Sequence, residues 1–267
     1  MDTARPLRLY QRRFQAYVDS FRGNDEFVDT NIDIKEKHTR RVCLHALALT
    51  RSLESSRSER EQAFLAALFH DIGRFPQIQR YATFNDRVSE DHALLGVREI
   101  KAAGLLEGLP ETTRRRVLTA VMVHNRLKLP SGLDPAQLRL VRILRDADKM
   151  DILDVLIQYY QSRNNGDNPA LDLDLPRGEN LSEAALMDIE AARCVAMQNV
   201  ASVQDFRLLQ TSWVFDINSA WAMNRLRRLG QIDWLLNRLP PGDRSSRAIR
   251  SIKTYMDAFE PVLENSS

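Results

Sequence analysis

The chain has 267 residues, of which 43% are hydrophobic, and a formal net charge of +2 at pH 7. This length allows one large domain or two smaller ones, and the apolar content suffices for a buried core. So small a net charge argues against a general polyanion-binding surface, and no nucleic-acid polymer is expected as a partner. No run approaches the length of a membrane span, and the arginine-containing stretch 1–14 lacks the apolar segment of a signal peptide, so a cytoplasmic protein is expected.

Helical periodicity runs through nearly the whole chain and predicts an all-α fold. The helices expected in the N-terminal half span residues 9–21, 34–53, 59–72, 90–103 and 111–125. The third of them is apolar from Ala63 to Phe69, which indicates a buried helix that Gly73 closes. The aromatic and polar stretch 75–87 is predicted to be irregular. Ser89 is the expected N-cap of the next helix, which would place His92 at its third position.

A long helix is predicted after residue 134, with Asp134 as its cap, Pro135 at its first position and its end near Tyr160. Residues 164–180 are rich in Gly, Pro, Asn and Asp and are expected to be a loop. Further helices are predicted at 181–199, 203–229, 231–239 and 244–263. The expected organisation is a helical core over 1–163, the loop 164–180, and C-terminal helices packed on the core over 181–267.

The pair His70-Asp71 ends the apolar helix 59–72. An unpaired carboxylate there would cost several kcal/mol or would shift its pKa until it was neutral. A metal ion removes that penalty because it binds a neutral imidazole and an ionised carboxylate. Taken alone, the pair is better explained by a local cap or an ion pair near Gly73-Arg74.

Four of the five histidines fall on separate predicted helices, each near a helix end or on an apolar face. They are His38, His70, His92 and His124. Asp148 lies four residues from both Leu144 and Ile152, so it is predicted to point to the core, whereas Asp146 is predicted to point to solvent. Histidine and carboxylate side chains that converge from several helices are how helical folds build metal sites.

The order His, His-Asp, His, His, Asp resembles that of the HD-domain superfamily of metal-dependent phosphohydrolases, which are helical bundles. The resemblance covers roughly residues 30–160. The stretches that carry it are His38, His70-Asp71-Ile-Gly-Arg74, Asp91-His92-Ala-Leu-Leu-Gly96, Val123-His124-Asn125 and Asp146-Ala-Asp148-Lys149. It implies one metal held by His38, His70, Asp71 and Asp148. It implies a second metal held by Asp71, His92 and His124, with Asp71 bridging the two.

The resemblance implies two divalent transition metals, which the ligand types leave open among iron, manganese, cobalt, nickel and zinc. Such a pair would generate a metal-bound hydroxide for attack on a phosphoester. The expected substrate is a small phosphomonoester or phosphodiester, nucleotide-like in character. Asp71 is predicted to be catalytic as the bridge. Arg74, where the family often has lysine, and Lys149 are the candidate phosphate contacts, with a salt-bridge role left open for both.

Two other functions remain open on the same ligands. One is an HD-type di-iron oxygenase, which would cleave a C–C or C–P bond with O₂. The other is a metal-containing module that senses a nucleotide without turnover. A cyclic-dinucleotide phosphodiesterase of the HD-GYP kind is disfavoured, because Arg74-Phe-Pro-Gln77 stands where the Gly-Tyr-Pro signature would follow. The oligomeric state is left open.

Overall fold

The computed structural model describes residues 4–23, 25–161, 175–176 and 180–263. Over these residues the predicted all-α fold is confirmed, because no β-strand forms and the only strand-like pairing is one bridge between Ser219 and Leu263. The packing divides the chain into two compact units between Asp151 and Ile152. The predicted loop 164–180 lies almost wholly outside the described residues. None of the helices in the described part is long and apolar enough to cross a membrane.

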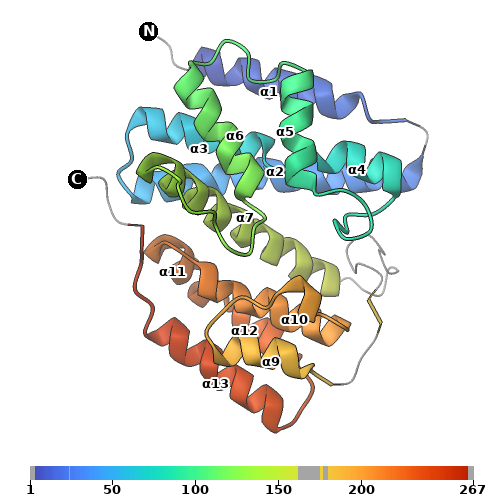
Figure 1. Ribbon diagram of the computed structural model, residues 1–267, viewed down its shortest axis with the longest axis vertical. Coiled ribbons are helices and arrows are strands. Elements are labelled where there is room, and N and C mark those ends of the chain that lie inside the picture. The colour runs from blue at the N-terminus through green and yellow to red at the C-terminus, as the bar shows by residue number, and fades with distance from the viewer. Residues whose placement is uncertain (1–3, 24, 162–174, 177–179, 264–267) are drawn as a thin grey trace. The chain divides into compact units, whose positions relative to one another are not determined.

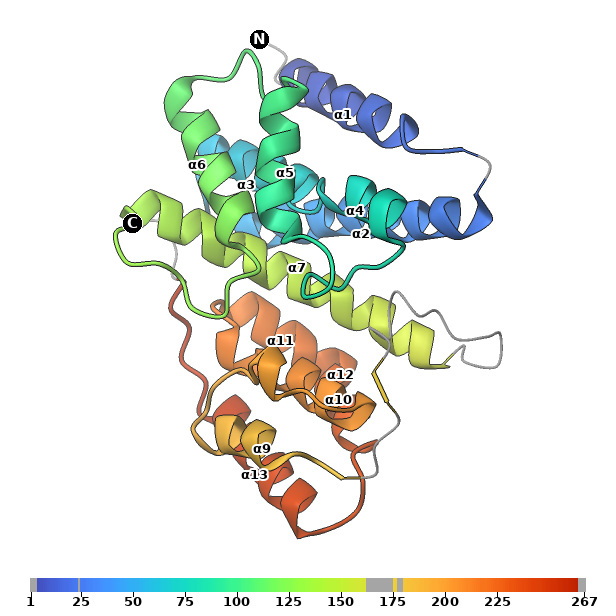
Figure 2. The ribbon, with the colours of Figure 1, turned by 45° about the vertical axis from the view of Figure 1, so that its right-hand side comes forward.

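Over the described residues, the first unit contains α1 to α6 and most of α7 (Figures 1 and 2). Their bounds are α1 Ala4–Asp19, α2 Glu26–Ser52, α3 Arg57–Phe69, α4 Arg74–Tyr81, α5 His92–Ala102, α6 Glu111–Val123 and α7 Pro135–Gln161. Helix α2 packs along α3 and α4, while α6 packs against α3 and α5. Phe14 of α1 contacts the rings of Phe69 and Phe75 edge-on, at centroid distances of 6.2 and 6.0 Å, and so closes the core over α3 and α4.

Local capping explains where two of these helices begin. Helix α2 starts eight residues before the predicted Ile34, because the Asp25 side chain accepts from Val28 N and Glu26 adds a favourable charge in the first turn. Helix α7 starts at Pro135 as predicted, and Asp134 accepts a hydrogen bond from Gln137 N at 2.8 Å.

The stretch predicted to be irregular contains α4, so that prediction was wrong for its first half. Pro76 lies in the first turn of α4, where its missing N–H costs no hydrogen bond, and Phe75 and Ile78 form a buried face. The N-cap of α5 is Asp91, not Ser89, since Asp91 accepts from the backbone N–H groups of residues 93 and 94. His92 is therefore the first residue of α5, not the third.

The second unit contains shorter helices than the sequence predicts. Their bounds are α9 Glu183–Glu190, η2 Met197–Asn199, α10 Val203–Ser212, η3 Trp213–Asp216, α11 Ala220–Leu229, α12 Gln231–Leu236 and α13 Asp243–Asp257. The predicted helix 181–199 ends early because Asp188 accepts from Ala196 N and Asn199 Nδ2 and so holds a turn. The predicted helix 203–229 is divided at Ser219, which caps α11 by accepting from Ala222 N.

Candidate metal centre

The six predicted ligand side chains come from five helices or their ends. His38 lies in the middle of α2, and His70 and Asp71 follow the last turn of α3. The others are His92 at the start of α5, His124 at the end of α6 and Asp148 within α7. All four histidines are at most 5% exposed. The structure brings all six side chains together.

The first centre is formed by His38, His70, Asp148 and one oxygen of Asp71. His38 Nε2 lies 3.2 Å from His70 Nε2 and 3.1 Å from Asp148 Oδ1. His70 Nε2 lies 3.5 Å from the same Asp148 oxygen. Asp71 Oδ2 lies 3.6 Å from both imidazole nitrogens. The donor atoms of His38, His70 and Asp71 lie close enough together to hold one metal ion, and Asp148 Oδ1 lies beside both imidazole nitrogens.

The second centre is formed by His92, His124 and the other oxygen of Asp71. The two Nε2 atoms lie 3.2 Å apart, and Asp71 Oδ1 lies 3.4 Å from that of His92 and 4.0 Å from that of His124. Asp71 therefore presents one oxygen to each centre. Asp71 thus belongs to two groups of three buried side chains, each of which could hold a metal ion.

Backbone carbonyls orient two of the histidines. The Nδ1 atom of His70 lies 2.8 Å from Ala67 O, and that of His124 lies 2.7 Å from Val121 O. Because a carbonyl oxygen can only accept, each Nδ1 carries the proton and donates it. Each Nε2 then presents its lone pair to the centre, which is the tautomer that a metal needs.

Carboxylates orient the other two histidines. Asp151 Oδ2 lies 2.7 Å from His38 Nδ1, and Asp86 Oδ2 lies 2.6 Å from His92 Nδ1. Arg41 binds Asp151 through two nitrogens, at 2.5 and 3.0 Å, and holds it ionised. Both Nδ1 atoms therefore also donate, and all four histidines turn Nε2 inward.

Burial favours the neutral form of both histidines in the second centre. Burial lowers the pKa of His124 to about 3, aided by the neighbouring His92, whose own pKa is lowered by burial and then by Arg74. In the second centre two neutral imidazoles thus direct lone pairs at each other with Asp71 Oδ1 beside them. No proton is shared between the two imidazole nitrogens, and a divalent ion would stabilise both of them together with Asp71 Oδ1. The donor set therefore fits a metal.

The first centre attracts positive charge in another way. Burial lowers the pKa of His38, but hydrogen bonds to Asp148 and Asp151 outweigh it, and the pKa is raised. Burial likewise opposes ionisation of Asp71, yet Lys35 and His70 hold its pKa well below the usual range. Asp71 thus remains a carboxylate, the form that binds metal.

Two glycines let the turn after α3 reach α5. A Cβ atom at Gly73 would lie 2.2 Å from the backbone oxygen of His92 and 2.6 Å from the backbone nitrogen of Gly96. One at Gly96 would lie 3.3 Å from the nitrogen of Gly73. This close backbone approach places His92 beside Asp71, so Gly73 positions the second centre.

Four important neighbours of the ligands went unpredicted. Besides Asp86, Asp151 and Arg41, Lys35 lies in the site with its Nζ 2.8 Å from Asp71 Oδ2. The one signal that could have identified Lys35 and Arg41 is their spacing of three residues on either side of His38, which puts all three on one side of α2. Asp86 lies in the segment predicted to be irregular and gave no such signal.

The predicted phosphate contacts have protein partners. Arg74 Nη1 donates to Gln77 Oε1, Phe84 O and Asp86 Oδ1 at 2.7 to 2.8 Å, and its Nε lies 3.6 Å from Asp71 Oδ1. Lys149 is buried, with Nζ 3.5 Å from Arg145 O in the same helix. Their contact with a substrate stays a prediction.

The predicted orientation of Asp146 was wrong. Asp146 is fully buried, while the Asp148 side chain is 23% exposed, although its carboxylate does reach His38. The helix is buried on more than one side here, since Arg145, Ala147 and Met150 are buried as well. A solvent-facing side therefore cannot be inferred from one apolar stripe.

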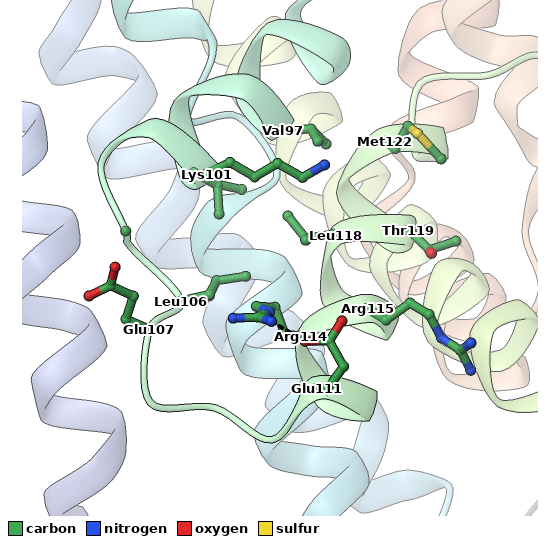
Figure 3. A pocket seen from close by; sticks show the side chains of 12 residues that line it. Val97, Lys101, Leu106, Glu107, Glu111, Arg114, Arg115, Leu118, Thr119 and Met122 are labelled. Carbon is green, nitrogen blue, oxygen red and sulfur yellow. Dashed lines mark hydrogen bonds and ion pairs between the residues drawn. The ribbon is translucent and has the colours of Figure 1, made fainter.

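A separate hollow of about 520 Å³ lies between α5, α6 and the loop that joins them (Figure 3). Its apolar residues include Val97, Leu118 and Met122, and Lys101 and Arg115 line it as well. None of the six predicted ligands lines it. It is therefore distinct from the metal centre.

The fold and the site define an all-α protein with a buried histidine and carboxylate cluster suited to divalent metals. Residues 36–153 match the family model of the HD domain, a range that contains all six predicted ligands. Residues 36–153 are therefore an HD domain, and proteins of this superfamily are generally metal-dependent hydrolases. No curated protein and no solved structure matches the chain.

Removing Asp86 should weaken the second centre selectively. In Asp86→Ala, His92 loses the carboxylate that fixes its tautomer, a kind of loss that typically lowers metal affinity about 10- to 100-fold. A calorimetric titration with Mn²⁺ should show one site with weakened affinity and one site with unchanged affinity. Arg87→Ala, an exposed neighbour, is the control and should bind like the wild type. An equal loss of metal affinity at both sites would contradict the assignment of His92 and Asp86 to a separate second centre.

Proposed function

We propose that this protein hydrolyses a phosphomonoester or phosphodiester, nucleotide-like in character, with two divalent metals bound at the centre. The observation that carries the proposal is the position of Asp71, one oxygen of which faces each pair of histidines. When bound, the two ions would lower the pKa of a water molecule and neutralise charge on the phosphoryl group.

The chain's own residues would hold this arrangement rigid. His38, His70 and Asp148 present their donor atoms on one side of Asp71, and His92 and His124 present theirs on the other. Because each imidazole is oriented by a hydrogen bond at Nδ1, little reorganisation is needed to bind the ions. Membership in the HD superfamily supports the hydrolase assignment at the level of reaction class.

The test is elemental analysis of the protein as isolated, followed by a panel of phosphoesters assayed with the metal that was found. We expect about two equivalents of a transition metal per chain, from the two-centre geometry, and release of phosphate or a nucleoside monophosphate. Chelation should abolish turnover, and restoring the metal should recover it. A metal-loaded protein that hydrolyses no member of the panel would contradict the proposal.

The same experiment separates the alternatives. The six ligands also suit iron. Iron-dependent oxygen uptake with a polyol or a phosphonate would indicate a di-iron oxygenase instead. Tight nucleotide binding without turnover would indicate a sensing module.

A further inference from the structure

We propose that Lys35 is the residue that binds the phosphoryl group of the substrate, and that without substrate its ammonium group is bound to Asp71. This rests on the proposed phosphoester substrate. Lys35 lies on α2, three residues before His38, so both side chains lie on the same side of the helix. The segment that matches the HD family begins at residue 36, so Lys35 lies just outside it.

The ammonium group lies inside the site. Lys35 Nζ is 2.8 Å from Asp71 Oδ2, and the two side chains are 10% and 5% exposed. The oxygen that it contacts also lies 3.6 Å from the Nε2 atoms of His38 and His70. Lys35 therefore adjoins the first centre directly, where a substrate phosphate would lie beside the ions.

Lys35 has hydrogen-bonding capacity that the protein does not use. An ammonium group has three N–H donors, and among the described residues Asp71 Oδ2 is the one acceptor recorded for it. The remaining contact is the face of the Phe84 ring, 5.2 Å from Nζ, which accepts no conventional hydrogen bond. Two donors on a buried cation can therefore serve an oxyanion, and a phosphoryl group supplies several oxygens.

Arg74, the other cation beside Asp71, is placed differently. Its Nη1 atom already donates to Gln77, Phe84 O and Asp86, and these contacts tie α4 to the segment that holds His92. Moving Arg74 to a substrate would break this network. The geometry thus assigns the substrate contact to Lys35 and a positioning role to Arg74.

Lys35 and a metal ion would also compete for Asp71 Oδ2. If Lys35 serves the substrate, its removal should leave metal binding intact or tighten it, because the shared oxygen then has no ammonium group beside it. If Lys35 instead only positions Asp71, its removal should weaken metal binding. Metal affinity and phosphate affinity therefore distinguish the two roles without any assay of turnover.

The experiment compares wild type, Lys35→Met, Lys35→Arg and the control Lys37→Met. Calorimetry first measures Mn²⁺ binding to the proteins after their metal has been removed by chelation, and then phosphate binding to the Mn²⁺-loaded proteins. Lys37 lies on the same helix with a 67% exposed side chain, and its partner is Asp33. We expect Lys35→Met to bind Mn²⁺ at least as tightly as wild type. Its phosphate affinity should fall about 10- to 100-fold, the loss expected for charge-assisted hydrogen bonds. Lys35→Arg should recover part of the phosphate affinity, and Lys37→Met should bind both Mn²⁺ and phosphate like the wild type.

Unchanged phosphate affinity in Lys35→Met would overturn the proposal, as would weakened Mn²⁺ binding or a wild type that binds no phosphate. A thermal melt followed by circular dichroism checks that each variant is folded, and Lys35→Gln gives a second neutral replacement if the methionine variant is not. The phosphate-binding result tests Lys35 independently of the proposed hydrolase activity. A wild type that binds phosphate through Lys35 but turns over no ester would contradict the hydrolase and leave the phosphate site standing.

Discussion

Asp71→Ala is expected to empty both metal positions at once and to abolish activity. One carboxylate oxygen lies 3.6 Å from His38 and His70, and the other lies 3.4 Å from His92 and 4.0 Å from His124, so its loss removes a ligand from each centre. We expect affinity for both ions to fall by at least about 100-fold, the upper end of what losing an outer hydrogen-bond partner costs. Metal content per chain, measured after dialysis, checks this.

A stability effect should accompany the loss of metal. Lys35 remains buried without its partner in Asp71→Ala, and breaking a buried ion pair costs about 3–5 kcal/mol. The double variant Asp71→Ala/Lys35→Met should recover much of that stability without recovering metal. Asp33→Ala removes a half-exposed carboxylate from α2 and serves as the control. An Asp71→Ala protein that retains one full equivalent of metal would show that the centres do not share this residue.

Gly73→Ala is expected to separate α5 from the turn after α3, which carries His70 and Asp71. The added Cβ would lie 2.2 Å from His92 O and 2.6 Å from Gly96 N, both backbone atoms that cannot rotate away. Overpacking of this kind typically costs 1–3 kcal/mol, and we expect about 3 kcal/mol here because backbone must move. Because His92 moves with its backbone, the second centre should lose its metal first. Denaturant unfolding and metal titration measure the two effects.

Gly23→Ala is the matched control, because a Cβ atom at Gly23 would meet nothing within 4 Å. It makes the same chemical change on the same unit, and its stability should stay within about 0.5 kcal/mol of wild type. If both glycine variants bind two ions and unfold alike, the close approach of Gly73 to α5 is not what positions His92.

Sequence patterns succeeded where the information is local. Helical spacing identified α2, α3, α6 and α7, and the cap at Asp134 marked the start of α7 correctly. They failed where two local signals compete. Asp91 caps α5, although Ser89 is an equally good capping residue, because the Ser89 hydroxyl is engaged by Asn85 O and Gln77. Such a contact depends on how α4 packs, which no spacing shows.

The sequence by itself determined the all-α class, the HD domain at 36–153 and the six residues that the fold collects, because helical periodicity and the order of rare histidines are properties of the chain. The tertiary structure alone decided which groups surround those ligands. Lys35 meets Asp71 across 36 residues of sequence, and Asp151 meets His38 across 113. Contacts over such separations arise only when helices pack, and they determine the orientation of His38 and the charge beside Asp71.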